Sequence, residues 1–481
     1  MPGVIIRTAT RSGPVNPDVP ETGRYYVPGL FTRGPVAAPR LVRSVAELVL
    51  EFGDRPTYSA AWDDLKTYFE EGGTEAVVTR VVGPAATTGT VSLPTAPATA
   101  TLRIDAASPG AWSSGAKVAV IAGRNAGTFA IEVTLGGQLV ERSDNLSSPA
   151  AAQAAFTTSR YIKVTDLGTG SNPAPTAQPV ALSAGVDDAA AVTGAMLTAA
   201  LSRFGAEWGS GAVAVPGQAA ATVATALIAH AKATNRLALL APAKGATEAD
   251  VTTLSGQLAS ADGGEYAGLF YPWIVVPGPA AGTTITTSPE GYVAAARARA
   301  HREVGPWRAP GGEIAAARYV VDVERRVTRA EGDRLDDAQV NAIRVIEGTV
   351  RLYGWRSLTT NVADFGFLTG RDVLNAVTVE AARRLEAYVF RPIDAKGFLL
   401  DSIAAELVGL VEPMRQAGGL YPRITDGNEV DPGYSVDVSE AINPAEQLNR
   451  NTIHAVLALR VSPVGALIDL TIVKAGMLAA V

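Results

Sequence analysis

Between residues 186 and 302, short apolar runs alternate with longer segments of helical character, and this alternation constrains the fold more than any other feature. It predicts strands at "AVAVP" (212–216), "RLALLAP" (236–242) and "YAGLFYPWIVV" (266–276), and helices at 189–204, 218–234, 247–260 and 288–302. Ser288 and Pro289 supply an N-cap and a first-position proline for the last helix. Helices and strands at such short spacing are typical of an α/β layer.

The same pattern begins nearer the N-terminus. "RYYVPGLFTRGPV" (24–36) predicts a strand, a turn and a loop, and "EAVVTRVV" (75–82) predicts a buried strand. Between them, Ser44 is followed at the third position by Glu47, which is the spacing of a capping box, and Ser59 is placed to cap a second helix. Residues 24–85 and 186–370 therefore form one predicted α/β core domain, interrupted by a different kind of sequence.

The interruption covers residues 86–185. Residues 83–101 consist almost entirely of Pro, Ala, Thr, Gly and Val, which is typical of a linker. Residues 102–182 then give five short alternating runs, separated by turns rich in Gly, Asn and Ser. This pattern predicts a small β domain, inserted into the α/β core and protruding from it.

Residues 371–481 form a third predicted region, an α+β domain. Apolar residues three and four apart predict two amphipathic helices. The positions are Leu374, Val377, Ala381, Leu385 and Tyr388 for the first helix, and Leu400, Ile403, Leu407, Leu410 and Met414 for the second. Pro413 is expected to kink the second helix or to end it early. Two alternating stretches, 453–464 and 467–474, predict strands after the helices. The fold class is therefore α/β (α+β) and multidomain.

Both ends of the sequence carry short strand-like segments that we expect to act as arms. At the N-terminus (residues 1–23), Val4, Ile5 and Ile6 precede "RSGPVNPDVPETG" (11–23), whose three prolines favour an extended chain. The tether from Ala9 to Gly23, about 15 residues, spans about 50 Å at roughly 3.3 Å per residue. Near the other end, the strand-like positions are Leu467, Ile468, Leu470 and Ile472. One interpretation is a disordered or self-pairing terminus. The other is strand addition to a neighbouring chain, since a strand this short is not stable alone.

Composition excludes several classes of function. The 481 residues suggest roughly two to four domains. The net charge of −6, from 41 basic and 47 acidic residues, argues against a dedicated nucleic-acid binder. The sequence contains no uninterrupted run of about 18 apolar residues, so no transmembrane helix is indicated. The N-terminus lacks the pattern of a signal peptide. The absence of cysteine leaves no disulfide, thiolate nucleophile or Cys metal site, which suits a reducing cytoplasm.

The residues that catalysis would need are sparse. His230, His301 and His454 are far apart in the sequence, and no zinc-protease, phosphate-loop, dinucleotide or nucleophile-elbow motif occurs. His301 is expected to be solvated at the end of its helix, and His454 to lie in a strand beside the core. The pairs Asp187–Asp188 and Asp336–Asp337 lie in polar loops without a partner that would separate their pKa values. We therefore expect that the protein is not an enzyme and that it has no cofactor and no metal site.

Six segments in sequence order carry a resemblance to a known family: "YVPGLFTRGPVAAPRLVRSVAELVLEFG" (26–53), "FEEGGTEAVVTRVV" (69–82), "SPGAWSSG" (108–115), "LFYPWIVV" (269–276), "GYVAAARARAHREVGPWRAPGG" (291–312) and "GTVRLYGWRSLT" (348–359). Together they resemble a tail sheath protein of contractile phage tails and related injection machines, over nearly the whole chain. The resemblance implies subunits stacked as rings in a helical sleeve, which contracts from a metastable extended state and drives a tail tube through a target envelope.

The resemblance also implies partners and a location. The partners are copies of the same chain, linked by arms that add strands to each other's sheets, together with the tail tube, baseplate and tail terminator proteins. Neither nucleic acid nor direct membrane insertion is implied. The location is the virion tail, after assembly in the host bacterial cytoplasm. By family analogy the second C-terminal helix faces the tube, so Arg415 and Arg423 are the residues we expect there. The helix is weakly charged and contains Pro413, so contacts with the tube are expected to be less electrostatic than in better charged relatives.

Three other interpretations remain open from the sequence. The first is a sheath of a non-phage injection system, which the neighbouring genes would identify. The second is a surface-binding or glycan-binding structural protein that stays monomeric, with the inserted β domain as its binding module. The third is an unusual α/β hydrolase, which requires the folded chain to bring a serine, a histidine and a carboxylate together.

Overall fold

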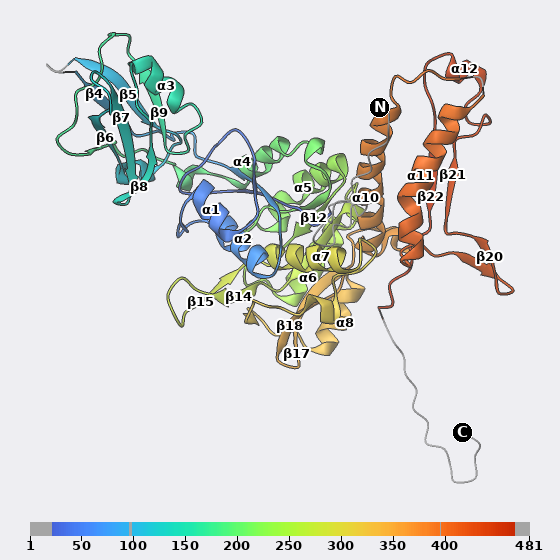
Figure 1. Cartoon of the computed structure of the whole chain (residues 1–481). Coiled ribbons are helices and arrows are strands. Elements are labelled where there is room, and N and C mark those ends of the chain that lie inside the picture. Colours follow the sequence, from blue (N-terminus) through green and yellow to red (C-terminus); the bar gives the residue numbers. More distant parts are fainter. Residues whose placement is uncertain (1–21, 96–98, 395, 467–481) are drawn as a thin grey trace, which may run out of the picture. The chain divides into compact units, whose positions relative to one another are not determined.

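The computed structural model describes residues 22–95, 99–394 and 396–466. Contacts along the described chain divide it into two compact units, 22–375 and 376–462, and each is described by itself (Figure 1). Within the described residues, no helix combines the length and the apolar character that crossing a membrane requires.

An eight-stranded sheet organises the unit 22–375, in the order β18-β17-β13-β12-β11-β1-β3-β2. The strands are β1 (Tyr25–Gly29), β2 (Arg40–Val42), β3 (Ala76–Arg80), β11 (Gly211–Val213), β12 (Arg236–Leu240), β13 (Ala267–Tyr271), β17 (Val340–Ile346) and β18 (Thr349–Tyr353). The six central strands are parallel, and β2 and β18 close the two edges in antiparallel pairing. This sheet confirms the α/β class predicted for these segments.

Helices cover both faces of this sheet, and its central strands are mainly apolar, as expected of strands that are buried on both sides. Alternate residues of β1 enter different apolar clusters: Tyr25 and Val27 one, and Tyr26 the other. The first cluster includes residues of α1 (Val45–Phe52), α2 (Ala60–Glu70) and α7 (Glu290–Glu303), and the second includes residues of α4 (Gly194–Ala199), α5 (Ala220–Thr234), α6 (Glu248–Leu258) and α8 (Arg329–Asp337). Two layers of helices thus enclose one sheet.

The N-caps predicted at Ser44 and Ser59 are confirmed, whereas the one predicted at Ser288 is wrong, because α7 begins at Glu290 and Pro289 is at its N-cap position. The Ser44 hydroxyl accepts a hydrogen bond of 3.1 Å from the Glu47 N–H, and Ser59 accepts from the Trp62 N–H in the same way. The Glu47 carboxylate accepts from the Arg43 N–H at 2.7 Å, one residue earlier than a capping box requires. The predicted helices at 218–234 and 247–260 correspond to α5 and α6.

Two other predictions between residues 186 and 302 need correction. The predicted helix at 189–204 is three short pieces, η2 (Ala189–Ala191), α4 and η3 (Ala200–Arg203), because Thr193 is extended and caps a new helix through its hydroxyl. The predicted strand at 266–276 ends at Tyr271, since Pro272 has no N–H to continue the ladder. The chain resumes as β14 (Ile274–Pro277) in a separate sheet with β15 (Thr284–Thr287) and β16 (Asp322–Val323).

Residues 90–181 form two further sheets that share one apolar cluster (Figure 1). One contains β4 (Thr90–Pro94), β5 (Ala100–Ala106) and β9 (Ile162–Asp166), and the other contains β10 (Val180–Ala181), β6 (Ala116–Ala122), β7 (Phe129–Leu135) and β8 (Gln138–Arg142), with helix α3 (Pro149–Ala155) in addition. The linker predicted at 83–101 is therefore wrong in part. It contributes β4, whose Leu93 is buried in this cluster.

Arg80, the last residue of β3, joins the main sheet to the start of this region. Its guanidinium is fully buried and donates to the carbonyls of Phe31 at 2.8 Å, Thr32 at 3.1 Å and Pro109 at 2.8 Å. Burial lowers the pKa of Arg80 to about 10. Gly110 follows with φ of +130°, and a Cβ there would lie 2.7 Å from the Thr32 carbonyl oxygen. This close approach explains the glycine in "SPGAW".

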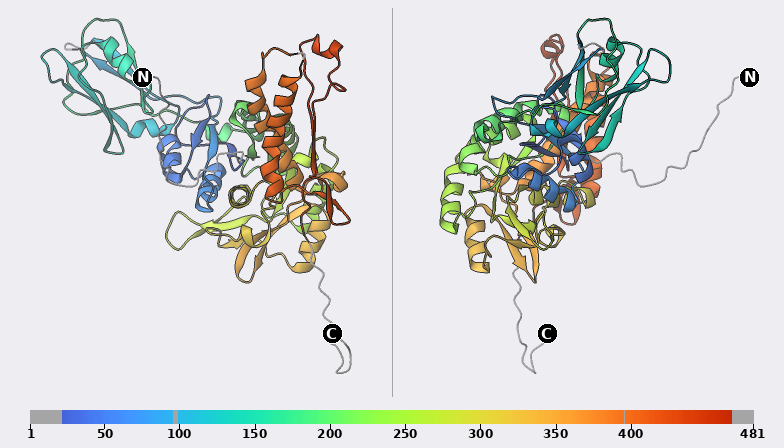
Figure 2. Two further views of the ribbon diagram at one scale, coloured as in Figure 1. Left: turned by 45° about the vertical axis from the view of Figure 1, so that its right-hand side comes forward. Right: turned by 90° about the vertical axis from the view of Figure 1, so that its left-hand side faces the viewer.

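Helix α10 (Leu368–Leu385) begins in the unit 22–375 and continues into the unit 376–462. It is followed there by η7 (Glu386–Tyr388) and α11 (Phe398–Gln416). The two helices lie side by side (Figure 2), and their apolar faces meet around Leu385, Leu400 and Leu407. Both predicted helices are confirmed, but α11 does not end early at Pro413. Pro413 has no N–H to donate to the carbonyl of Gly409, four residues earlier in the helix. Gly409 is exposed, so water can bond this carbonyl and the helix continues.

Candidate functional site

Two small sheets complete the unit 376–462. β21 (Tyr434–Asp437) pairs with β22 (Val456–Leu459), and β19 (Arg423–Thr425) pairs with β20 (Asn428–Asp431); among the described residues neither sheet has a third strand. Val436 and Leu457 contact the apolar cluster of α11, which holds β21 and β22 in place. Their outer edges present backbone N–H and C=O groups, the usual acceptor for an added strand.

Exposed apolar side chains are concentrated in this unit. Eight of the 18 large apolar side chains that are exposed among the described residues lie within 376–462, and the other ten are spread over the larger unit. The eight are Val389, Phe390, Phe398, Val408, Tyr421, Ile424, Val430 and Val456. Contiguous patches of exposed apolar side chains mark contacts with other molecules, so these eight residues are candidates for such a contact.

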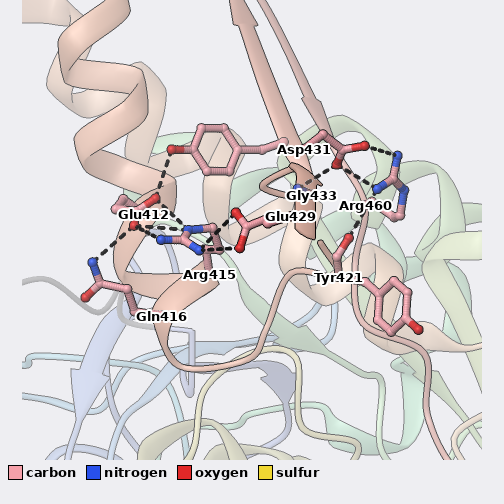
Figure 3. Close-up of polar contacts among 9 residues, drawn as sticks. Glu412, Arg415, Gln416, Tyr421, Glu429, Asp431, Gly433 and Arg460 are labelled. Atoms are coloured by element: carbon pink, nitrogen blue, oxygen red, sulfur yellow. Dashed lines mark hydrogen bonds and ion pairs between the residues drawn. The ribbon is translucent and has the colours of Figure 1, made fainter. Parts of the chain in front are cut away.

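Arg415, expected from the sequence to face a tube, is engaged within its own unit (Figure 3). In the last turn of α11 it forms ion pairs with Glu412 at 2.6 Å and with Glu429 of β20 at 3.3 Å. Glu412 also accepts from the Tyr434 hydroxyl at 2.9 Å, and Arg415, Gln416 and Tyr434 together lower its pKa to about 2. The charge of Arg415 is therefore compensated, and its side chain connects α11 to the β19–β20 hairpin.

A second ion pair holds the same hairpin. Arg460 binds Asp431 at 2.8 Å, and Asp431 also accepts from the Gly433 N–H (Figure 3). Beside this pair lies a shallow depression of about 430 Å³, lined by Tyr421, Pro422, Arg423, Ile424 and Arg460. Arg423, the other residue expected to face a tube, is exposed there, and among the described residues its guanidinium forms no ion pair. The charge of Arg415 is thus paired within the unit, whereas the charge of Arg423 is free to contact another molecule.

The predicted arm residues Val4, Ile5, Ile6, Leu467, Ile468, Leu470 and Ile472 lie outside the described residues. The described residues begin at Thr22, where the predicted N-terminal arm joins the folded unit. Thr22 is 3% exposed, and both its carbonyl and its hydroxyl form hydrogen bonds to α7.

A buried polar cluster at this point was missed by the sequence analysis. Arg297 of α7 donates to Asp372 of α10 at 2.5 and 2.8 Å, and to the Thr22 carbonyl at 2.5 Å. His301 Nδ1 lies 2.8 Å from the Thr22 hydroxyl, and its Nε2 lies 3.5 Å from Asp372. The indole N–H of Trp355 donates to the same carboxylate at 3.3 Å. One cluster therefore joins the start of the folded chain, α7 and α10.

The electrostatics of this cluster follow from burial. Burial acts first to raise the pKa of Asp372, but the charge of Arg297 and the facing His301 outweigh it, and the pKa is lowered. Burial and Arg297 lower the pKa of His301, so the imidazole stays neutral near pH 7. The expectation of a solvated His301 is wrong because α7 is buried on all sides from Glu290 to His301. The available signal was the alanines on every face of "AAARARAHRE", which allow close packing all round a helix.

The same helix carries a second buried ion pair. Arg299 binds Glu71 at 2.9 Å, and Glu71 also accepts from the N–H groups of Tyr319 at 2.8 Å and Val320 at 2.9 Å. Both partners are at most 1% exposed. This pair connects α7 to the end of α2 and to the loop before β16, and it has no bond to Thr22 or α10.

The other candidate catalytic residues have separate structural partners. His230 lies 3.1 Å from the Arg236 guanidinium, and burial together with that charge lowers its pKa to about 4. His454 is exposed beside Gln447, so its predicted place in a strand beside the core is wrong. Asp336 pairs with Arg356, and Asp187 accepts from a tyrosine hydroxyl. Within 22–95, 99–394 and 396–466, no three His, Cys, Asp or Glu residues converge as a metal site would require.

Comparison with known proteins gives a likeness in structure alone. No family model and no curated protein matches the sequence. Among solved structures, the sheath tail protein of Listeria innocua has a TM-score of 0.64 at 12% identity, over 88% of this chain and 89% of that one. The sheath tail protein of Desulfitobacterium hafniense has a TM-score of 0.55 at 17% identity, over 91% and 93%. The helical sheath of the anti-feeding prophage in its contracted state has a TM-score of 0.55 at 14% identity, over 98% and 99%.

These similarities establish that the chain has the fold of contractile-system sheath proteins over nearly its whole length. The resemblance inferred from the six sequence segments is thereby confirmed at the level of fold.

Proposed function

We propose that this chain is the structural subunit of a contractile tail sheath, which polymerises into a helical sleeve around a tail tube and contracts to drive the tube through a target envelope. The observation that carries the proposal is a shared fold that extends over 98% of this chain when it is compared with a helical sheath in its contracted state. The role is structural and needs no catalytic site.

Strand addition is the proposed link between subunits. The arms around Val4–Ile6 and Leu467–Ile472 would pair with the outer edges of β21 and β22 in neighbouring copies. Two facts support this: the β21–β22 sheet has no third strand among the described residues, and α11 holds its inner face. Because the donor and the acceptor surfaces differ, the contact is head-to-tail, and repetition builds a helix. Tethered strands also let folded domains rotate past one another without separating.

Contraction would draw its energy from surface buried between subunits. If each subunit buries a further ~400 Å² of apolar surface, about 25 cal/mol per Å² gives roughly 10 kcal/mol per subunit as an upper bound. The exposed apolar side chains of 376–462 are candidates for that surface. Summed over many rings, this energy makes a nucleotide unnecessary. Contacts with the tube, around Arg423 and Arg415, would instead be weak and polar so that they can break.

The proposed division of labour follows the domains expected from the sequence. Residues 24–85 and 186–370 act as the rigid core, 86–185 as a protruding module and 371–481 as the domain that carries the strand contacts. The tail tube, the baseplate and the tail terminator are the proposed partners beyond the chain itself. Assembly in a bacterial cytoplasm is consistent with a sequence that has no cysteine. The solved structures of this fold come from tail proteins and from injection systems, so gene neighbours are needed to choose between a phage tail and another contractile machine.

Electron microscopy of the purified, concentrated protein tests the proposal. Hollow helical tubes wider than a tail tube would support it, and a reconstruction would then show which strands pair. If only monomers form, the experiment is repeated with the tube protein present. Monomers in both cases would overturn the sheath function and favour a protein that acts alone, such as a surface-binding or glycan-binding one.

A further inference from the structure

We propose that Arg297, Asp372, His301 and Thr22 form a buried clasp that carries mechanical load between the N-terminal arm and the C-terminal unit. This inference rests on the proposed sheath function, in which neighbours pull on both segments. The clasp lies where the arm enters the fold. Thr22 bonds to α7 through its main chain and its side chain, and α7 bonds to α10 through Arg297 and Asp372.

The covalent order of the chain shows why such a clasp is needed. Only two residues separate Thr22 from β1, the parallel strand between β3 and β11 in the main sheet. A pull on the arm without the clasp would enter β1 directly and act on its ladder with β3 and β11. With the clasp, the pull passes from Thr22 into α7 and then into α10. Helix α10 continues past Asn375 to Leu385 and so carries the load into the unit 376–462.

The burial of the clasp's ion pair makes it resistant to a pulling force. Its ion pair is at most 2% exposed, so water is not available to replace either partner as the bonds lengthen. Removing one partner leaves the other charge buried and unpaired, which makes partial opening unfavourable. His301 stays neutral and adds a contact on each side, to the Thr22 hydroxyl and toward Asp372. The cluster therefore opens as one unit under force.

The second buried pair on α7 provides a matched control. Arg299 and Glu71 are buried to the same degree as Arg297 and Asp372, on the same helix, with bonds of similar length. Their bonds connect α7 to α2 and to the loop before β16, which lie off the route from Thr22 to α10. If the two pairs only stabilise the fold, breaking either one should have the same effect under force. If the clasp carries load, breaking the Arg297–Asp372 pair should have the larger effect.

Force spectroscopy on the full-length monomer tests the proposal. Because the chain contains no cysteine, handles can be attached at two introduced ones, Thr10→Cys and Gly465→Cys. Under constant force along this axis, we expect Asp372→Asn to shorten the lifetime of the folded unit by about tenfold or more relative to Glu71→Gln. Urea unfolding should show that the two variants are destabilised to a similar extent. Equal lifetimes for the two variants at matched chemical stability would overturn the proposal.

A milder variant keeps the test decisive if Asp372→Asn fails to fold. Thr22→Val removes only the hydroxyl contact with His301, and we expect it to shorten the lifetime along the same axis while urea stability changes little. An unchanged lifetime would contradict the clasp. Since the measurement uses monomers, its outcome is independent of tube formation, so the clasp and the sheath function can fail separately.

Discussion

The carboxylate of Asp64 on α2 accepts a hydrogen bond of 2.6 Å from the backbone N–H of Gly291 and so caps α7 from a neighbouring helix. Pro289, at the N-cap position of α7, provides no side-chain cap. Asp64 also accepts from the Tyr25 hydroxyl at 2.8 Å, which ties the cap to β1. These two donors hold the buried Asp64 carboxyl group at the N-terminus of α7. The cap therefore fixes α7, the most buried helix of the core, at its first turn.

Glu290 shares this site and leads to the first prediction. It is 1% exposed, its Oε2 has no hydrogen-bond partner in the structure, and burial raises its pKa from 4.5 to about 7. Burial also raises the pKa of the neighbouring Asp64, and the charge of Glu290 raises it further. The folded state thus retains a proton that the unfolded chain loses near pH 4.5. The resulting stabilisation is complete below pH 4.5 and is lost as the pH rises to about 7.

We expect Glu290→Gln to flatten this pH dependence. The amide cannot ionise, so the free energy of unfolding should change less between pH 5 and pH 7 than it does in the unmodified protein. Urea titrations at several pH values measure this directly. Glu303→Gln, at the exposed far end of the same helix, is the control and should leave the slope unchanged. A slope that Glu290→Gln leaves unaltered would show that the carboxyl group is not protonated in the fold.

A second prediction concerns Arg80. Its guanidinium donates to four carbonyls in fixed directions, and a lysine ammonium cannot reproduce that fork. Because hydrogen bonds to charged groups contribute about 1.5–3 kcal/mol each, we expect Arg80→Lys to destabilise the unit 22–375 by roughly 3 kcal/mol. Limited proteolysis should show faster cleavage near residues 83–110. Arg124→Lys, at an exposed position, should change neither readout, and slow cleavage in both variants would argue against Arg80 as the joint.

A third prediction separates the two arginines that were expected to face a tube. Arg415 is already paired, so Arg415→Ala should loosen the β19–β20 hairpin and lower the thermal midpoint slightly. Arg423 is exposed, so Arg423→Glu should leave the thermal midpoint unchanged but weaken co-sedimentation with the tube protein. Arg450→Glu, another exposed arginine of the same unit, is the control. If Arg423→Glu and Arg450→Glu weaken binding equally, only net charge matters and Arg423 has no specific role.

The sequence was informative for several features whose structural cause is local. Ser44 and Ser59 cap helices three residues away, and the apolar runs of β11 and β12 are buried because neighbouring parallel strands enclose them. The long amphipathic helices α10 and α11 were also predictable from their spacing. Pro272 was a local signal as well. A single strand was nevertheless predicted across it, because the change of sheet after Tyr271 depends on distant strands.

The buried cluster on α7 was not predictable in this way. Arg297 and Asp372 are 75 residues apart, and Arg299 and Glu71 are 228 apart. Alternating Arg and Ala on a helix looks solvated until these partners are known, which is why His301 was misassigned. Charged residues on an Ala-rich helix need a long-range partner to be buried, and one sequence contains no information on which carboxylate provides it.

The arms provide the last prediction. Deleting residues 1–20 removes Val4, Ile5 and Ile6 but leaves Thr22 and its bonds to α7 in place. We therefore expect a folded, soluble monomer that no longer forms tubes, as measured by size-exclusion chromatography and electron microscopy. Ile5→Pro should weaken tube formation more than Thr10→Pro, because a proline in a paired strand removes a ladder donor whereas a proline in a tether does not. Normal tubes from the truncated chain would exclude the N-terminal arm as the link between subunits.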